Sequence, residues 1–275
     1  MMLLSGLAFT VMQLMIKDLS RFHVFQIIFF RCAITAVLCM ISMRQLGVRM
    51  IGRRQKWLVI RAVCGLISMI LFFVTIARMP LGAAVTLRYL SPVFTALFAV
   101  LILSEKVKPI QWVYFLGTMV GVALLKGFDV RIDGLSLGIG LLSAVFAGMV
   151  YVLIRKIGDS EHPLVIINYF MVLGAVFGSV AMLPYWETPV LMEWVCLIAI
   201  GVVGFVAQWF MTRAFQREPA SRIAMVKYVE LLYTLVFAYL LFGESYHLLS
   251  LGGMLLILVF MILNVRVRHS REREG

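Results

Sequence analysis

The sequence has few charged residues, and acids are the scarcest of them. Only 14% of its 275 residues are charged, with 13 acids against 25 bases, while 63% are hydrophobic and the mean hydropathy is +1.03. Soluble domains are about a quarter charged and about half apolar. The composition excludes a soluble globular domain and predicts an all-α integral membrane protein, since long apolar runs cross a bilayer as helices.

Sequence signals for bound metals, nucleotides and nucleic acid are also missing. The four cysteines lie in apolar runs without CxxC or CxxH spacing, as is typical of small buried hydrophobes. No phosphate-binding loop and no HExxH motif occurs. The net charge of +12 comes from bases clustered between apolar runs, which is a topology signal. We therefore expect no cofactor, no metal, no nucleic-acid partner and no enzymatic activity.

Ten apolar runs, bounded by charge, proline or glycine, divide the chain, and we expect a transmembrane helix in each. A span needs about 20 residues, so the first run is short. The start of the sequence has neither a basic leading region nor a small-residue cleavage site, so we expect no cleavable signal peptide. The runs are 3–16, 22–43, 57–77, 81–103, 109–125, 134–154, 163–184, 191–212, 220–242 and 246–265.

The basic residues indicate how these helices are oriented. With the N-terminus in the cytoplasm, sixteen Lys and Arg fall on the cytoplasmic side, five on the opposite side and four within the runs. Cytoplasmic loops of multi-pass proteins carry an excess of Lys and Arg. We therefore expect a multi-pass protein of the cell (inner) membrane with both termini cytoplasmic.

The two halves of the sequence resemble each other at an offset of 137 to 139 residues. Five runs in each half, an odd number, would insert the halves with opposite orientation. We therefore expect two inverted five-helix repeats, residues 1–130 and 131–275, around a central cavity. The matched identities include Ser5 with Ser143, His23 with His162, Trp57 with Trp194, and Tyr89 with Tyr228.

The second part of each repeat carries a family resemblance. In 77–125 a proline precedes the fourth run, a glutamate closes it and a glycine-containing run follows, and 214–260 repeats this layout. The chain resembles, over almost its whole length, the EamA-type members of the drug/metabolite transporter superfamily. The resemblance implies a ten-helix transporter whose cavity is lined mainly by the first, third, fourth, sixth, eighth and ninth helices.

Charged side chains within the runs mark the expected substrate path. A charge at mid-bilayer costs at least about 2.5 kcal/mol, so such residues usually face a cavity or a partner. Arg88 and its repeat counterpart Lys227 each share a helix face with residues three and seven positions later. We expect both stripes to line the cavity, although Arg88 could instead snorkel and Lys227 pair within its own helix. The stripes are Arg88, Ser91 and Thr95, and Lys227, Glu230 and Thr234.

Two features near Arg88 refine this picture. Pro92 cannot donate to the carbonyl of Arg88, so we expect a kink there. Arg31, Arg88 and Lys227 carry three positive charges against the one negative charge of Glu230. This excess of two positive charges favours an anionic or zwitterionic substrate. Arg61 is expected to snorkel at the cytoplasmic interface. Glu230 could pair permanently with Lys227 or exchange a proton during transport.

Other candidate contacts are polar or aromatic residues, each of which is alone more often a structural hydrogen bond or interface ring. They are Tyr89, Tyr228, Gln13, Gln208 and Trp209. Gly117 with Gly121, and Gly174 with Gly178, permit close helix contact inside the bundle or in a homodimer. We expect a monomer or a weak homodimer.

Taken together, the residues and the resemblance predict a secondary transporter that works by alternating access. Its substrate would be a small polar or amphipathic metabolite, anionic or zwitterionic, such as an amino acid or organic acid. Import and export are both open. The alternatives are an intramembrane enzyme, or a channel or sensor without carrier activity. The expected partners are the small-molecule substrate and the lipid bilayer.

Overall fold

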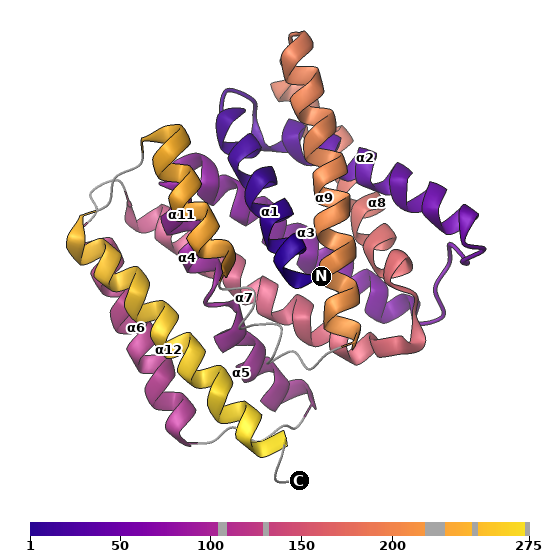
Figure 1. Ribbon diagram of the computed structural model, residues 1–275. Helices are drawn as coiled ribbons and strands as arrows, with labels where there is room; N and C mark the ends of the chain where they lie inside the picture. Colours follow the sequence, from indigo (N-terminus) through magenta and orange to yellow (C-terminus); the bar gives the residue numbers. More distant parts are fainter. Residues whose placement is uncertain (104–108, 129–131, 218–228, 244–246, 273–275) are drawn as a thin grey trace.

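The computed structural model describes residues 1–103, 109–128, 132–217, 229–243 and 247–272. Within these ranges all regular structure is helical (Figure 1). Two 3-10 turns, Gly158–Ser160 and Leu183–Tyr185, flank α8. The helices are α1 Met2–Asp18, α2 Val24–Gln45, α3 Gln55–Arg78, α4 Leu81–Arg88, α5 Ser91–Leu103, α6 Pro109–Phe128, α7 Gly134–Ile157, α8 Pro163–Ala181, α9 Leu191–Arg217, α11 Val229–Phe242 and α12 Leu248–Glu272.

Six helical segments of the described chain are long and apolar enough to cross a membrane. Helices α1, α6, α11 and α12 occupy the other four predicted runs. The hydropathy pattern therefore located the helices well. The six segments are Val24–Gln45, Gln55–Arg78, Leu81–Ile102, Gly134–Ser160, Pro163–Ala181 and Leu191–Ala214.

The fourth run contains a break. Helix α4 ends at Arg88, α5 begins at Ser91, and Tyr89 and Leu90 form a turn between them. Pro92 is the second residue of α5, where its missing N–H removes no intrahelical hydrogen bond. The expected kink is thus present as an interruption of the helix, and it places Arg88 at a helix terminus.

The pattern of helix contacts stays the same when each helix is replaced by its counterpart in the other half of the sequence. Helix α3 packs on α7 as α9 packs on α1, and α2 packs on α9 as α8 packs on α3. Helix α5 packs on α7 as α11 packs on α1. Each of α2 and α6 packs on its own counterpart, α8 and α12 respectively, and the α6–α12 pair lies at one edge of the bundle (Figure 1).

The glycine pairs lie inside the bundle. A Cβ on Gly178 would stand 2.9 Å from Phe29 Cα, and one on Gly174 would stand 2.6 Å from Cys32 Sγ, so both glycines let α8 approach α2. A Cβ on Gly117 would stand 2.4 Å from the Phe260 ring of α12. These glycines therefore serve close packing within the chain.

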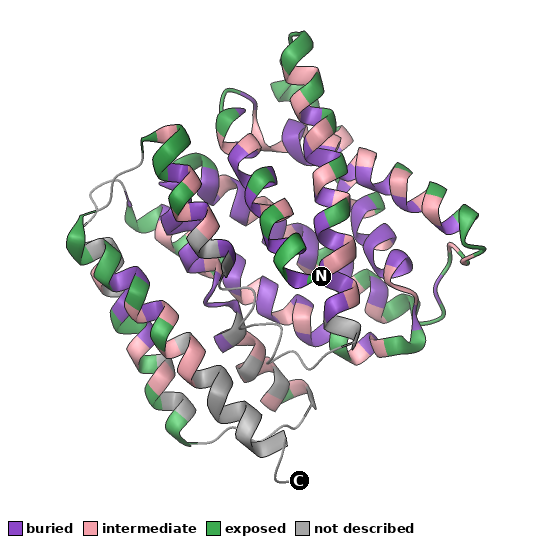
Figure 2. Ribbon diagram, viewed as in Figure 1, coloured by how far each residue is buried: buried purple, intermediate pink, exposed green. Residues whose placement is uncertain are grey.

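Buried residues gather in the middle of the bundle, and exposed residues lie mainly along its outer surface (Figure 2). Many of the exposed residues are large and apolar. Outward residues such as Leu101, Leu116 and Val180 each expose about two thirds of their surface, at 69%, 69% and 66%. An apolar exterior of this kind matches hydrocarbon and would be a liability in water.

Two histidines related by the repeat offset cap helices on this scaffold. Nδ1 of His23 accepts the Phe25 N–H at 3.4 Å, and Nδ1 of His162 accepts the Leu164 N–H at 3.3 Å. Burial lowers the pKa of both imidazoles, and Arg213 lowers that of His162 further. Both caps therefore depend on the neutral imidazole, since a protonated Nδ1 cannot accept a hydrogen bond.

The folded protein should consequently lose stability in mild acid. The unfolded chain binds these protons more readily, so the caps contribute fully above the ordinary histidine pKa of about 6.5 and are lost as pH falls through the lowered values. We expect the melting temperature to fall by about 2–4 °C between pH 7.5 and 5. The double variant His23→Asn and His162→Asn, whose amide oxygens also cap helices, should show a smaller fall; an equal fall would contradict this role.

Candidate functional site

A cavity of about 80 Å³ lies at the centre of the bundle. Helices α1, α3, α4, α7, α9 and α11 all contribute to its wall, with single residues from α2 and α8. Most of the wall is apolar, formed by side chains such as Phe72, Phe73 and Met211. Its polar residues are Gln13, Arg31, Arg61, Ser68, Arg88, Tyr89, Tyr151, Gln208 and Glu230.

Arg88 is held firmly at this cavity. Its Nη1 donates to Ser143 Oγ at 2.9 Å, to Ser68 Oγ at 3.1 Å and to the Ser68 carbonyl at 3.3 Å. Its guanidinium also lies over the Phe72 ring, 4.5 Å from the centroid. The break after α4 and these contacts together orient the guanidinium toward the cavity that it lines.

The two serines that hold Arg88 also join α3 to α7. Ser68 Oγ donates to the Ser143 carbonyl at 2.9 Å, and Ser143 Oγ is 3.0 Å from the Ser68 carbonyl. The corresponding contact of α1 with α9 is a 2.8 Å hydrogen bond from Ser5 Oγ to the Ala207 carbonyl. The identity of Ser5 with Ser143 in the two halves was the sequence signal for this pair of contacts.

Arg31 and Arg61 line the same cavity and are almost fully buried, with 3% and 1% of their surfaces exposed. Arg31 donates from Nη1 to Met69 Sδ, and its guanidinium lies 5.4 Å from the Phe73 centroid. Arg61 lies 4.7 Å from the Phe170 centroid. The expectation that Arg61 snorkels is wrong, because its side chain turns into the bundle and packs on α8.

Glu230 is the acidic residue among the described residues that line the cavity. It is buried with 4% of its surface exposed, and its Oε1 accepts a 3.0 Å hydrogen bond from Gln13 Nε2. Gln208 and Tyr89 also line the cavity, so the structure brings four other predicted site residues together with Arg88. Lys227 and Tyr228 lie outside the described residues.

Three predicted stripe residues make helix contacts instead of lining the cavity. Thr95 Oγ1 bonds the Ser91 carbonyl at 2.8 Å and approaches the Gly148 carbonyl of α7 at 3.4 Å. Thr234 Oγ1 bonds the Glu230 carbonyl at 2.9 Å and lies 3.4 Å from Thr10 Oγ1 of α1. Thr95 and Thr234 therefore hold α5 on α7 and α11 on α1, while Ser91 accepts the Thr95 hydrogen bond within α5.

Trp209 also lies away from the central cavity. It lines an outer pocket with Phe205, Phe210 and the end of α2, and Arg213 stacks on it at 5.3 Å. Conversely, sequence reasoning did not count Arg61 among the site residues. The spacing of Arg61, Gly65, Ser68 and Phe72 along one face of α3 was the available signal, since all four line the cavity.

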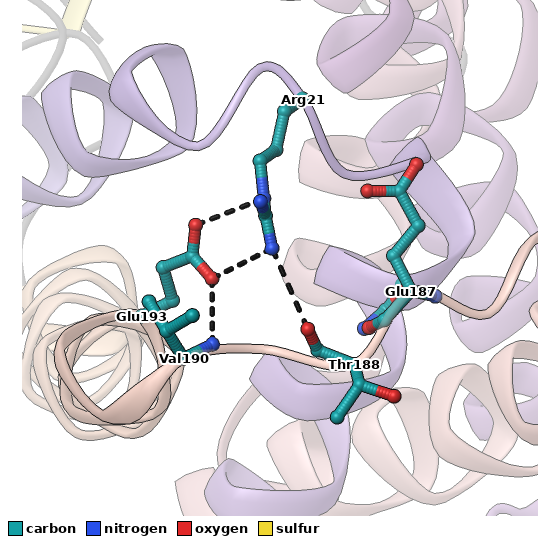
Figure 3. A network of polar contacts seen from close by, with 6 residues as sticks. Arg21, Glu187, Thr188, Val190 and Glu193 are labelled. Atoms are coloured by element: carbon teal, nitrogen blue, oxygen red, sulfur yellow. Dashed lines mark hydrogen bonds and ion pairs between the residues drawn. The ribbon is translucent and has the colours of Figure 1, made fainter.

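A polar network, here called the Arg21 network, joins the two sequence halves at one end of α2 (Figure 3). Arg21 Nε and Nη2 each lie 2.9 Å from an oxygen of Glu193, whose Oε2 also accepts the Val190 N–H at 2.8 Å. Gln26 exchanges hydrogen bonds of 2.7 and 3.1 Å with the backbone of Glu187. The α1–α2 loop is thereby tied to the α8–α9 loop.

A second network, the Glu161 network, joins the halves beyond the other end of α2. Glu161 Oε1 accepts the Arg54 N–H at 2.7 Å, and Arg54 Nη1 donates to the Lys156 carbonyl at 3.1 Å. The Gly52 N–H donates to Tyr169 Oη at 3.4 Å. Here the α2–α3 loop is tied to the α7–α8 loop, so the two networks link equivalent loops at opposite ends of the bundle.

Comparison with known proteins assigns this architecture. The EamA-like transporter family matches residues 1–126 and again 134–266. The chain is 32% identical over 262 residues to "Pseudopaline exporter CntI" of Pseudomonas aeruginosa strain UCBPP-PA14, covering 94% of this chain and 92% of that one. It is 29% identical to human "Solute carrier family 35 member G1", covering 93% and 75% respectively.

A solved crystal structure shares the fold, with a TM-score of 0.71 at 16% identity over 100% of this chain and 99% of the other. These relatives are transporters, so the alternative of an intramembrane enzyme is not favoured. Taken with the apolar helices, the matches make the chain a multi-pass membrane transporter that belongs to the EamA-like transporter family, within the drug/metabolite transporter superfamily.

Proposed function

We propose that this transporter is a secondary carrier that moves a small anionic or zwitterionic metabolite by alternating access. The observation that carries the proposal is the charge of the central cavity. Among its described lining residues, three arginines face one glutamate. Buried charges are costly unless they are compensated, so a substrate with carboxylate or similar groups would stabilise the loaded cavity.

The proposed substrate contacts are the predicted residues that line the cavity. Arg88 supplies a fixed guanidinium, which suits bidentate binding of a carboxylate. Gln13 and Gln208 supply amide groups, Tyr89 supplies an aromatic side chain, and Glu230 would bind a cationic group of a zwitterion. The apolar remainder of the wall would accept the carbon skeleton.

Alternating access is supported by two features of the fold. The helix contacts keep their pattern when the two halves are exchanged, as expected for inverted repeats of five helices each in residues 1–130 and 131–275. The Arg21 and Glu161 networks tie the halves at opposite ends of α2. We propose that these networks open in turn, which would expose the cavity to one side of the membrane at a time.

We further propose export across the inner membrane, with both termini cytoplasmic, as the direction and setting. One relative is named as an exporter. The distribution of basic residues supports the orientation. We propose a monomer as the working unit, since Gly117, Gly174 and Gly178 serve contacts within the chain.

Counterflow in proteoliposomes tests the proposal. Vesicles loaded with an unlabelled candidate should accumulate the same labelled compound transiently and saturably, and protein-free vesicles should not. Labelled amino acids, organic acids and nucleotides form the panel. Absence of counterflow for the whole panel would contradict carrier activity. If Glu230 exchanges the coupled proton, Glu230→Gln should remove the pH dependence of net transport; a parent-like pH profile would exclude that role.

A further inference from the structure

Two arginines that line the cavity, Arg31 and Arg61, have guanidinium N–H donors without a hydrogen-bond acceptor in the described part of the chain. Arg31 Nε, Arg61 Nε and Arg61 Nη1 are buried and have no hydrogen-bond partner among the described residues. Arg88 differs, because Ser68 and Ser143 accept hydrogen bonds from its Nη1. Buried guanidinium donors are costly to leave unsatisfied. The vacant donors therefore point to a ligand anion at Arg31 and Arg61.

The arginines mark two positions along α3. Arg88 is bonded to Ser68, and Arg31 contacts Met69 and Phe73 at the same level of α3. Arg61 is seven residues earlier than Ser68, which is two helical turns or about 10 Å. Between these levels the wall is made by Gly65 and aromatic rings. The cavity thus has a cationic group toward each end and an apolar middle.

We propose that Arg61 forms a second anion subsite, so that the substrate carries two carboxylate-like groups, one held there and one held by Arg88 with Arg31 beside it. This rests on the proposed function and adds the substrate class. With Glu230 ionised, three arginines leave an excess of two positive charges among the described lining residues, which a dianion balances. At about 80 Å³ the cavity is several times the roughly 10–15 Å³ that a single water requires, which leaves room for a small ligand.

Binding of succinate and butyrate to the purified full chain tests this inference. These probes share a four-carbon chain and differ in the second carboxylate. The parent should bind succinate at least about tenfold more tightly than butyrate. In Arg61→Gln, succinate affinity should fall about tenfold, toward that of butyrate. Arg213→Gln, which removes an arginine outside the central cavity, should keep the parent preference.

Several results would overturn the inference. These are equal affinity of the parent for the two probes, no succinate binding up to millimolar concentration, or an unchanged preference in Arg61→Gln. If Arg61→Gln does not fold, Arg61→Lys keeps the charge with fewer donors and should give an intermediate preference; parent-like preference there would count against bidentate binding. Binding with the expected pattern but without counterflow would refute the carrier proposal alone. Counterflow of other solutes with unchanged preference would refute the second subsite alone.

Discussion

Replacing Arg88 with alanine is expected to lower substrate exchange by at least about tenfold while the protein remains folded. Hydrogen bonds to charged groups contribute about 1.5–3 kcal/mol, and 1.4 kcal/mol corresponds to a factor of ten in affinity. The substitution removes one proposed anion contact. It leaves the reciprocal hydrogen bonds between Ser68 and Ser143, which should preserve the contact of α3 with α7.

The exchange rate in proteoliposomes, normalised to the amount of monodisperse protein, measures this effect. Arg78→Ala is the matched control, since Arg78 ends α3 and contacts Asp133 and Ser136 away from the cavity. It should keep exchange within about twofold of the parent, as expected of a partly exposed ion pair. Parent-like exchange by Arg88→Ala would show that the cationic cavity does not bind the substrate.

Replacing Gly178 with leucine is expected to cause the largest loss of stability. Even a Cβ at this position would stand 2.9 Å from Phe29 Cα and 3.0 Å from Phe29 N, so backbone must move. Overpacking of this kind typically costs about 1–3 kcal/mol, and the larger side chain should exceed the cost of alanine. Because α2 and α8 pack extensively on each other, we expect Gly178→Ala to melt several degrees lower and Gly178→Leu to be recovered mainly as aggregate.

Gly138 provides the control for this series. It lies in α7, is exposed, and a Cβ there would meet nothing within 4 Å. Gly138→Ala and Gly138→Leu should therefore remain as stable as the parent or slightly more so, since both residues favour helix over glycine. Fluorescence-detected gel filtration after heating compares the four variants. Equal melting of Gly178→Leu and Gly138→Leu would contradict the packing of α8 on α2.

The helices of this protein could be predicted from sequence because lipid requires long apolar segments with every backbone group paired. The break at Tyr89 and Leu90 could also be predicted, since Pro92 lacks the N–H that would bond the carbonyl of Arg88 in a continuous helix. Position along a run, however, indicated wrongly that Arg61 reaches the interface. Its burial depends on Phe170 of α8, more than a hundred residues away, which supplies the ring on which the guanidinium lies.

The polar stripes show a second limit. A period of 3.6 residues indicates which side chains share a helix face but not which neighbour that face meets. Thr95 was expected at the cavity and instead contacts the α7 carbonyl of Gly148, because the break before Ser91 separates α5 from α4. Thr234 likewise meets Thr10 of α1. Trp209 lies on α9, which does line the cavity, but its own side chain lines the outer pocket instead.

Cross-linking the loops at each end of the bundle tests alternating access most directly. Cysteines would replace Arg21 and Glu193 in one variant and Arg54 and Glu161 in another, after the four native cysteines are changed to alanine. A short bismaleimide should abolish counterflow in both variants and spare the four single-cysteine controls, because each network must open once in every transport cycle. Full counterflow with either pair shown to be cross-linked would contradict this mechanism.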